Sequence, residues 1–211
     1  MKEIYISIVL VVIFICAMII GLLITNQGKE KKDKYNFLIN FPYEMEAKSP
    51  KLNLVFRLVL ALFCGVCSIS SIVILFVDGT YLLEKVLSLL LIINSFLLVG
   101  LFLLNMNNYK IHLINSVSFM VINSIGYFLI GYLPLRDNFT FYPLWICIVG
   151  FVIFAILIFL LILPSIKNWY ILKKDSEGNL TRGKVFPLAL LEWVNILAYI
   201  LIFVLLAVNY F

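Results

Sequence analysis

The sequence predicts an all-α integral membrane protein, folded as a bundle of six transmembrane helices in a single domain. Of its 211 residues, 64% are apolar and only 13% are charged, against about 25% charged residues in an average soluble domain. The apolar residues fall into six runs of about 20 residues, which is the length a helix needs to cross a bilayer. These runs are continuous and do not alternate, so we interpret them as helices rather than strands.

Each predicted span is an apolar run flanked by charged residues or proline. The first has an apolar stretch of about 20 residues, longer than the 7–15 residues of a signal peptide, and no small-residue cleavage pattern follows it. The second follows the charged first connection, and the third follows Glu84 and Lys85. The fourth is the most polar, the fifth ends near Pro164, and the sixth carries Glu192 in its first turns. The spans cover residues 4–25, 54–77, 86–106, 111–133, 144–166 and 188–211.

Prolines mark the borders of these spans. A proline lacks an N–H group and breaks a helix interior, so we expect prolines in connections or near helix ends. Pro164 lies near the end of the fifth span. The other five are expected in the connections, namely Pro42, Pro50, Pro134, Pro143 and Pro187.

The basic residues predict an orientation. Thirteen of the 16 Lys and Arg residues lie in or beside the connections 26–53, 107–110 and 167–187. Because cytoplasmic connections carry an excess of Lys and Arg, we expect these three in the cytoplasm and both termini outside. The 13 Lys against 3 Arg, with frequent Ile and Asn, are typical of a low-GC bacterial genome. We therefore expect a multi-pass protein of a bacterial plasma membrane.

Three ionisable residues stand closest to the membrane interior, and all three are expected at its cytoplasmic edge: Arg57, His112 and Glu192. One hypothesis is a proton or ion gate, since ionisable groups in a membrane usually mark function. The alternative, which we favour, is that the side chains reach out to the interface, with Arg57 paired to Glu192.

Neutral polar residues form a layer near the middle of the membrane. The candidates for a polar cavity are Asn94, Asn115, Asn123, Tyr127 and Tyr199. In one interpretation they line a cavity for a neutral or amphipathic solute. In the other, which we favour, they hold helices together, because buried amides and hydroxyls must find partners in lipid.

Chemistry-bearing motifs are scarce. Cys64 and Cys67 match a redox C-x-x-C pattern but lie deep in a span, and we expect Ala61, Cys64, Gly65 and Ser68 to form a small-residue face for helix packing. The chain has one His and shows neither a metal-binding His–Glu motif nor a nucleophile motif. We therefore expect no enzymatic activity, cofactor or metal site.

The first connection is the most distinctive segment. A basic run over residues 29–34 precedes the aromatic stretch from Tyr35 to Tyr43. We expect the lysines on anionic lipid headgroups and the aromatic rings in the membrane interface. The alternative is a docking surface for a cytoplasmic or membrane partner; nucleic acid is not expected.

These features predict a non-enzymatic subunit or partner of a membrane complex that acts through its basic cytoplasmic loops. The first alternative is a small-solute transporter, or a solute-binding transport subunit, which uses the neutral polar layer. An intramembrane enzyme is the weaker alternative, because the sequence offers few acids, bases or metal ligands.

Overall fold

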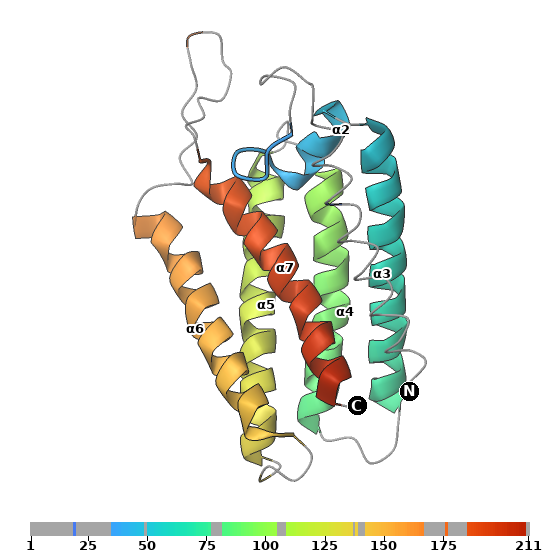
Figure 1. Cartoon of the computed structure of the whole chain (residues 1–211), viewed down its shortest axis with the longest axis vertical. Coiled ribbons are helices and arrows are strands. Elements are labelled where there is room, and N and C mark those ends of the chain that lie inside the picture. The colour runs from blue at the N-terminus through green and yellow to red at the C-terminus, as the bar shows by residue number, and fades with distance from the viewer. Residues whose placement is uncertain are drawn as a thin grey trace.

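The computed structural model describes residues 35–48, 50–76, 82–104, 109–136, 142–166 and 185–209, together with Ile19, Asn138 and Ser176. Within these ranges the chain folds into helices joined by turns, without a strand (Figure 1). The elements are η1 (Pro42–Glu44), α2 (Met45–Lys48), α3 (Pro50–Phe76), α4 (Leu82–Leu103), α5 (Tyr109–Arg136), α6 (Leu144–Ile166) and α7 (Pro187–Asn209).

Five of these helices, α3 to α7, are long and apolar enough to cross a membrane. They correspond to the second to sixth spans predicted from the sequence, so the all-helical membrane architecture is confirmed for this part of the chain. The predicted first span, residues 4–25, lies outside the described residues except for Ile19. Ile19 is helical and packs against the hydrophobic core.

Two helix borders differ from the sequence prediction because of proline. Pro50 and Pro187 begin α3 and α7, a position where the missing N–H would have no helical partner in any case. Pro134, expected in a connection, instead lies inside the last turn of α5 and is buried. That expectation was wrong: α5 continues through Pro134, which removes one hydrogen bond to the carbonyl four residues earlier but buries the proline ring inside the protein.

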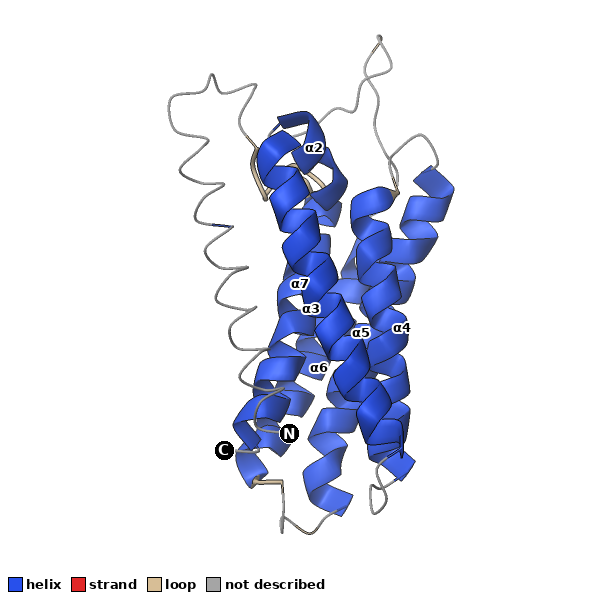
Figure 2. Ribbon diagram, turned by 90° about the vertical axis from the view of Figure 1, so that its right-hand side faces the viewer, coloured by secondary structure: helices blue, strands red, loops and turns tan. Residues whose placement is uncertain are grey.

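The five long helices run alternately up and down, as Figure 2 shows from the side. α3 lies beside α4, α4 beside α5, and α5 beside α6, while α7 contacts α5 and α6. α7 is the most enclosed helix, with 72% of its apolar window buried, whereas α6 has only 22% of its window buried. The polar side chains of Glu192, Asn195 and Tyr199 on α7 are accordingly buried inside the bundle.

The tightest crossing joins α5 and α6 through two glycines. A Cβ atom added to Gly150 would lie 2.5 Å from the backbone nitrogen of Gly131 and 2.6 Å from its Cα. Small residues allow backbones to approach this closely, which favours helix association in lipid, where the hydrophobic effect between helices is lost. The sequence analysis did not single out this pair.

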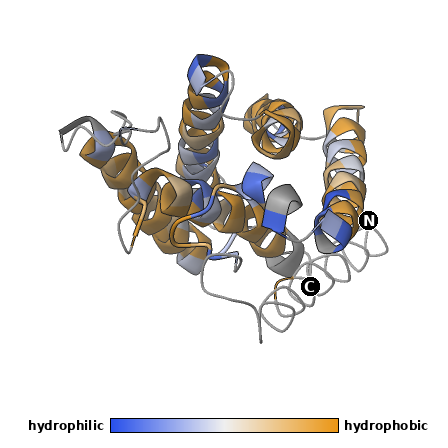
Figure 3. Cartoon of the chain, turned by 90° about the horizontal axis from the view of Figure 1, so that it is seen from above, coloured by the Kyte–Doolittle hydropathy of each residue, from blue (hydrophilic) through white to orange (hydrophobic). Residues whose placement is uncertain are grey.

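The beginnings of α3, α5 and α7 lie at one end of the bundle, together with α2 (Figure 1), and η1 contacts α2 and α7 there. Figure 3 views the bundle from this end. We call it the capped end, because residues 35–45, hereafter the cap, cover it. At the opposite end the Tyr142 hydroxyl donates a 2.6 Å hydrogen bond to Oε1 of Glu84, which joins the beginning of α6 to that of α4.

Candidate functional site

The cap is held in its shape by its own polar side chains. Oδ1 of Asn36 accepts a hydrogen bond from the backbone N–H of Leu38 at 2.9 Å, and Oδ1 of Asn40 accepts one from the N–H of Asn36 at 3.0 Å. Oε2 of Glu44 accepts a bond from the N–H of Phe41 at 2.8 Å, which closes the start of η1. Short Asn side chains favour such turns because they bond to backbone groups close in sequence.

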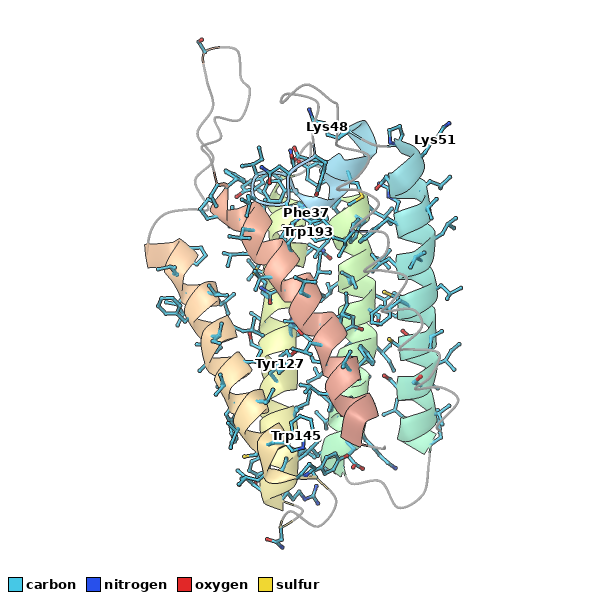
Figure 4. All side chains as sticks on the ribbon, viewed as in Figure 1. Phe37, Lys48, Lys51, Tyr127, Trp145 and Trp193 are labelled. Carbon is cyan, nitrogen blue, oxygen red and sulfur yellow. The ribbon has the colours of Figure 1, made fainter. Side chains whose placement is uncertain are left out.

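Aromatic contacts fix the cap onto α7. The ring of Phe37 meets the ring of Trp193 edge to face, with centroids 4.8 Å apart (Figure 4). The Trp193 indole N–H donates to the carbonyl of Asn40 at 3.2 Å. In addition, the N–H of Phe186 donates to the carbonyl of Leu38 at 2.7 Å. The cap and the beginning of α7 thus form one packed unit.

The cap corrects one expectation drawn from the sequence. The aromatic stretch was expected in the membrane interface, yet its Tyr35 and Phe41 are buried within the protein. The Tyr35 hydroxyl also donates to the carbonyl of Phe41 at 2.9 Å. Tyr35 has an apolar ring and a polar hydroxyl, so an internal pocket with a backbone acceptor suits it as well as the membrane interface does.

Under the cap lies an ionisable pair. Nε2 of His112, in the first turn of α5, is 2.9 Å from Oε1 of Glu192 on α7, and both side chains are about 2% exposed. The rings of Phe41 and Tyr43 stand edge to face over the imidazole at 5.5 and 5.4 Å between centroids. Burial of a single carboxylate would be costly, so the pairing explains how Glu192 is tolerated there.

The second nitrogen of His112 determines where the protons lie. Nδ1 is 2.8 Å from the carbonyl oxygen of Leu104, which only accepts hydrogen bonds, so Nδ1 carries a proton. The short contact between Nε2 and Oε1 of Glu192 then requires one proton between these two atoms. The pair holds that proton as imidazolium and carboxylate, or as imidazole and carboxylic acid, and is neutral as a unit in both forms.

The sequence grouped Arg57 with His112 and Glu192, but the hydrogen bonds of the described residues do not join Arg57 to either of them. Glu192 is bonded to His112, while the Arg57 guanidinium donates to the carbonyl of Phe102 at 2.9 Å. The expected Arg57–Glu192 pair is therefore wrong. The expectation that His112 and Glu192 reach out to the interface also fails, because the cap covers both.

The predicted polar layer links α4, α5 and α7. The Tyr199 hydroxyl is 2.6 Å from the Ser95 hydroxyl and donates to the Leu91 carbonyl at 3.0 Å. The Tyr127 hydroxyl donates to the Ala198 carbonyl at 2.6 Å. Both tyrosine side chains are fully buried, and Figure 4 labels Tyr127 among the helices. These bonds run from one helix to the next.

The amides of the layer divide into two groups. Nδ2 of Asn123 donates to the Asn195 carbonyl and Nδ2 of Asn115 to the Leu97 carbonyl, each at 2.9 Å. Asn115 also lies so close to Gly100 that a Cβ there would come within 2.5 Å of its Oδ1. Asn94, in contrast, is 1% exposed, and neither atom of its amide has a protein partner.

Asn195 is a member of this layer that the sequence analysis missed. It is buried, and its Nδ2 donates to the Leu191 carbonyl at 3.0 Å while its own carbonyl receives Asn123. Its position three residues after Glu192 could have indicated that it is buried, since residues three apart share one face of a helix.

The cysteine region of α3 differs from the expected packing face. Cys64 and Cys67 are buried and free. Ala61 and Gly65 are exposed, and nothing lies within 4 Å of a Cβ placed at Gly65. Among the described residues, the close helix crossing is at Gly131 and Gly150 and not at this face.

The described residues show no group of three His, Cys, Asp or Glu side chains that could hold a metal ion. No protein-family model, no curated protein and no solved structure matches the chain.

Proposed function

We propose that this protein is a non-catalytic subunit of a membrane complex, which meets its partner through the basic residues of the capped end. The observation that supports the proposal is that residues of the polar layer form hydrogen bonds between helices of this chain. Tyr127, Tyr199, Asn115 and Asn123 each bond a neighbouring helix of the same chain. These bonds engage the two hydroxyls and two amide nitrogens between helices, and Oδ1 of Asn123 is the atom of these four side chains that is buried without a partner among the described residues.

The capped end also has the charge that a docking surface needs. Lys51 and Lys110 are exposed there, at the beginnings of α3 and α5, and Lys48 lies close by on α2 (Figure 4). In the sequence, further lysines precede the cap at residues 29–34 and precede α7 at residues 167–184. A surface of one sign favours a partner of the opposite sign and speeds the encounter. We therefore expect an acidic partner, reached from the cytoplasm of a bacterial cell.

The test is a pair of photo-crosslinking side chains placed in the native membrane. One replaces Lys110, at the capped end, and the matched control replaces Arg136, in the last turn of α5 at the opposite end; both positions are exposed. We expect a discrete protein adduct from position 110 and none of that mass from position 136. Equal adducts from both positions, or none from either, would contradict the proposal.

One observation supports the alternative function, solute transport. The Asn94 amide is buried without a partner among the described residues, which costs free energy in lipid, and a polar solute that bonded it would recover that cost. A transport role predicts that Asn94→Leu abolishes solute movement while the protein still folds. The subunit role predicts that the same variant keeps its adduct at position 110 and unfolds no more readily than the parent.

A further inference from the structure

The cap covers both members of the His112–Glu192 pair, hereafter the buried pair. The rings of Phe41 and Tyr43 lie edge to face over the imidazole, with centroids 5.5 and 5.4 Å from its own. Trp193, which directly follows Glu192 in α7, donates its indole N–H to a backbone carbonyl of the cap at 3.2 Å. The contacts that close the cap therefore lie directly beside the buried pair.

The buried pair also lies close to the capped end of its helices. His112 is the fourth residue of α5 and Glu192 is the sixth residue of α7. With a rise of about 1.5 Å per residue, both lie within about 8 Å of the beginnings of their helices. Displacement of the cap would therefore let water reach both side chains.

With the cap closed, the buried pair is neutral only when it holds one proton between Nε2 of His112 and Oε1 of Glu192. Loss of this proton leaves a buried carboxylate without a cation, and a second proton leaves a buried imidazolium without an anion. Either state places an uncompensated charge under aromatic rings, which is costly. The closed cap therefore favours the form with one proton over a wide range of pH.

Few other groups near the buried pair could respond to pH. The ionisable side chains on the described elements around it are Tyr35, Tyr43, Glu44, Arg57, Tyr109 and Lys110. Of these, Glu44 has a charge that acts on both members of the pair. Histidine is the side chain that ordinarily changes charge between about pH 5 and 8, and His112 is the only histidine of the chain. A response of the cap in this range would therefore point to the buried pair.

We infer that the buried pair is a proton-dependent switch for the cap. The cap is most tightly closed while the pair holds one proton, and it opens more readily once water removes that proton. The switch does not depend on the partner proposed above, because the opening of the cap can be measured on the purified chain alone.

The expected pH dependence follows from the number of protons that the pair holds before and after opening. A solvent-exposed glutamic acid has a pKa of about 4.3 and an exposed histidine has one of about 6.5. Between these values the open pair also holds one proton, so opening does not depend on pH. Above about pH 6.5 the open pair holds none, so each further pH unit favours opening about tenfold. Below about pH 4.3 the open pair holds two, so acid favours opening as well.

The test is hydrogen–deuterium exchange of the cap amides in the full chain, purified in an uncharged detergent. The amides of Asn40 and Phe41 are bonded in the closed cap, to the Asn36 carbonyl and the Glu44 carboxylate. Their protection factor is compared across pH, because it divides out the pH dependence of exchange in an open chain. We expect it to be constant up to about pH 6.5 and to fall about 100-fold by about pH 8.5. A constant protection factor across the whole range would overturn the inference.

Two variants assign the response to the buried pair. The double variant His112→Gln, Glu192→Gln keeps two side chains that can bond each other and removes both titratable groups, so its protection factor should not fall. If it does not fold, the double Leu variant lacks the same groups and carries the same expectation. Glu44→Gln is the matched control, because it removes the neighbouring charge and keeps an oxygen that can accept from the Phe41 N–H. A fall in the double variant, or no fall in Glu44→Gln, would contradict the inference.

Discussion

Tyr127 and Tyr199 show how single residues organise the interior of this protein. Each carries a large apolar ring and one hydroxyl, and each hydroxyl bonds an atom of a neighbouring helix. In lipid the apolar ring gains little by leaving the solvent, because the solvent is apolar too. Interhelical hydrogen bonds of about 0.6–2 kcal/mol then carry specificity for one helix arrangement. The buried His112–Glu192 pair acts in the same way under the cap.

Breaking this pair from one side should destabilise the protein strongly. Glu192→Leu or His112→Leu alone leaves an ionisable group buried without its partner, which costs about 3–5 kcal/mol. The double variant removes both groups and should recover most of that loss, since an apolar pair of similar volume is often neutral. The free energy of unfolding in a mixed-micelle denaturation series measures all four proteins.

Glu192→Gln is the matched control for the same cycle. Its amide N–H can donate to Nε2 of a neutral His112, so the hydrogen bond is kept and the negative charge is removed. We expect this variant to unfold within about 1 kcal/mol of the parent. Additive losses in the double Leu variant, with no recovery, would show that the two side chains are not coupled.

At the scale of whole elements, the sequence predicts a helix correctly where that helix depends on the composition of its own residues. Composition and run length are enough to predict α3 to α7, because crossing a membrane demands about 20 apolar residues in a row whatever surrounds them. The neutral polar layer could be predicted for the same reason, since its residues interrupt apolar runs. The partner of each residue could not, because it depends on how helices pack.

Glu192 and Phe37 illustrate the contacts that could not be predicted from the sequence. The partner of Glu192 is His112, 80 residues away in the chain, and Arg57 was an equally reasonable choice on charge alone. Phe37 was expected in the membrane interface. Its contact with Trp193, more than 150 residues further along the chain, arises only when the chain folds. Gly131 and Gly150 are unremarkable in sequence, and their importance arises only because two backbones cross there.

The crossing of α5 and α6 yields a prediction at the element scale. Gly150→Val places a branched side chain against the backbone of Gly131, which has no room to move without separating the helices. We expect a loss of about 1–3 kcal/mol, typical of an overpacked interior. Thermal unfolding in detergent, followed by circular dichroism, measures it.

Gly65→Ala is the matched control in α3. Nothing lies within 4 Å of the added Cβ atom, so the substitution brings no clash. Replacing a mid-helix glycine with alanine should instead stabilise the protein by about 0.5–1 kcal/mol. A Gly150→Val protein as stable as the parent would mean that α5 and α6 do not cross at this point.

For the molecule as a whole, the two ends of the bundle differ. The capped end is closed by the cap, is joined to α7 through Trp193, and carries Lys48, Lys51 and Lys110 at the described helix ends. The opposite end carries Lys85 and Arg136 among its few charges. This asymmetry is the basis of the proposal that the capped end faces the cytoplasm and meets a partner there.

The most direct test of this proposal is cysteine labelling of intact cells with a membrane-impermeant maleimide. The four native cysteines lie within predicted spans, so single cysteines replacing Lys110 and Arg136 report the two ends. We predict that position 136 is labelled from outside, and that position 110 is labelled only after the membrane is opened. Labelling of position 110 in intact cells would place the basic capped end outside and contradict the proposed orientation and docking function together.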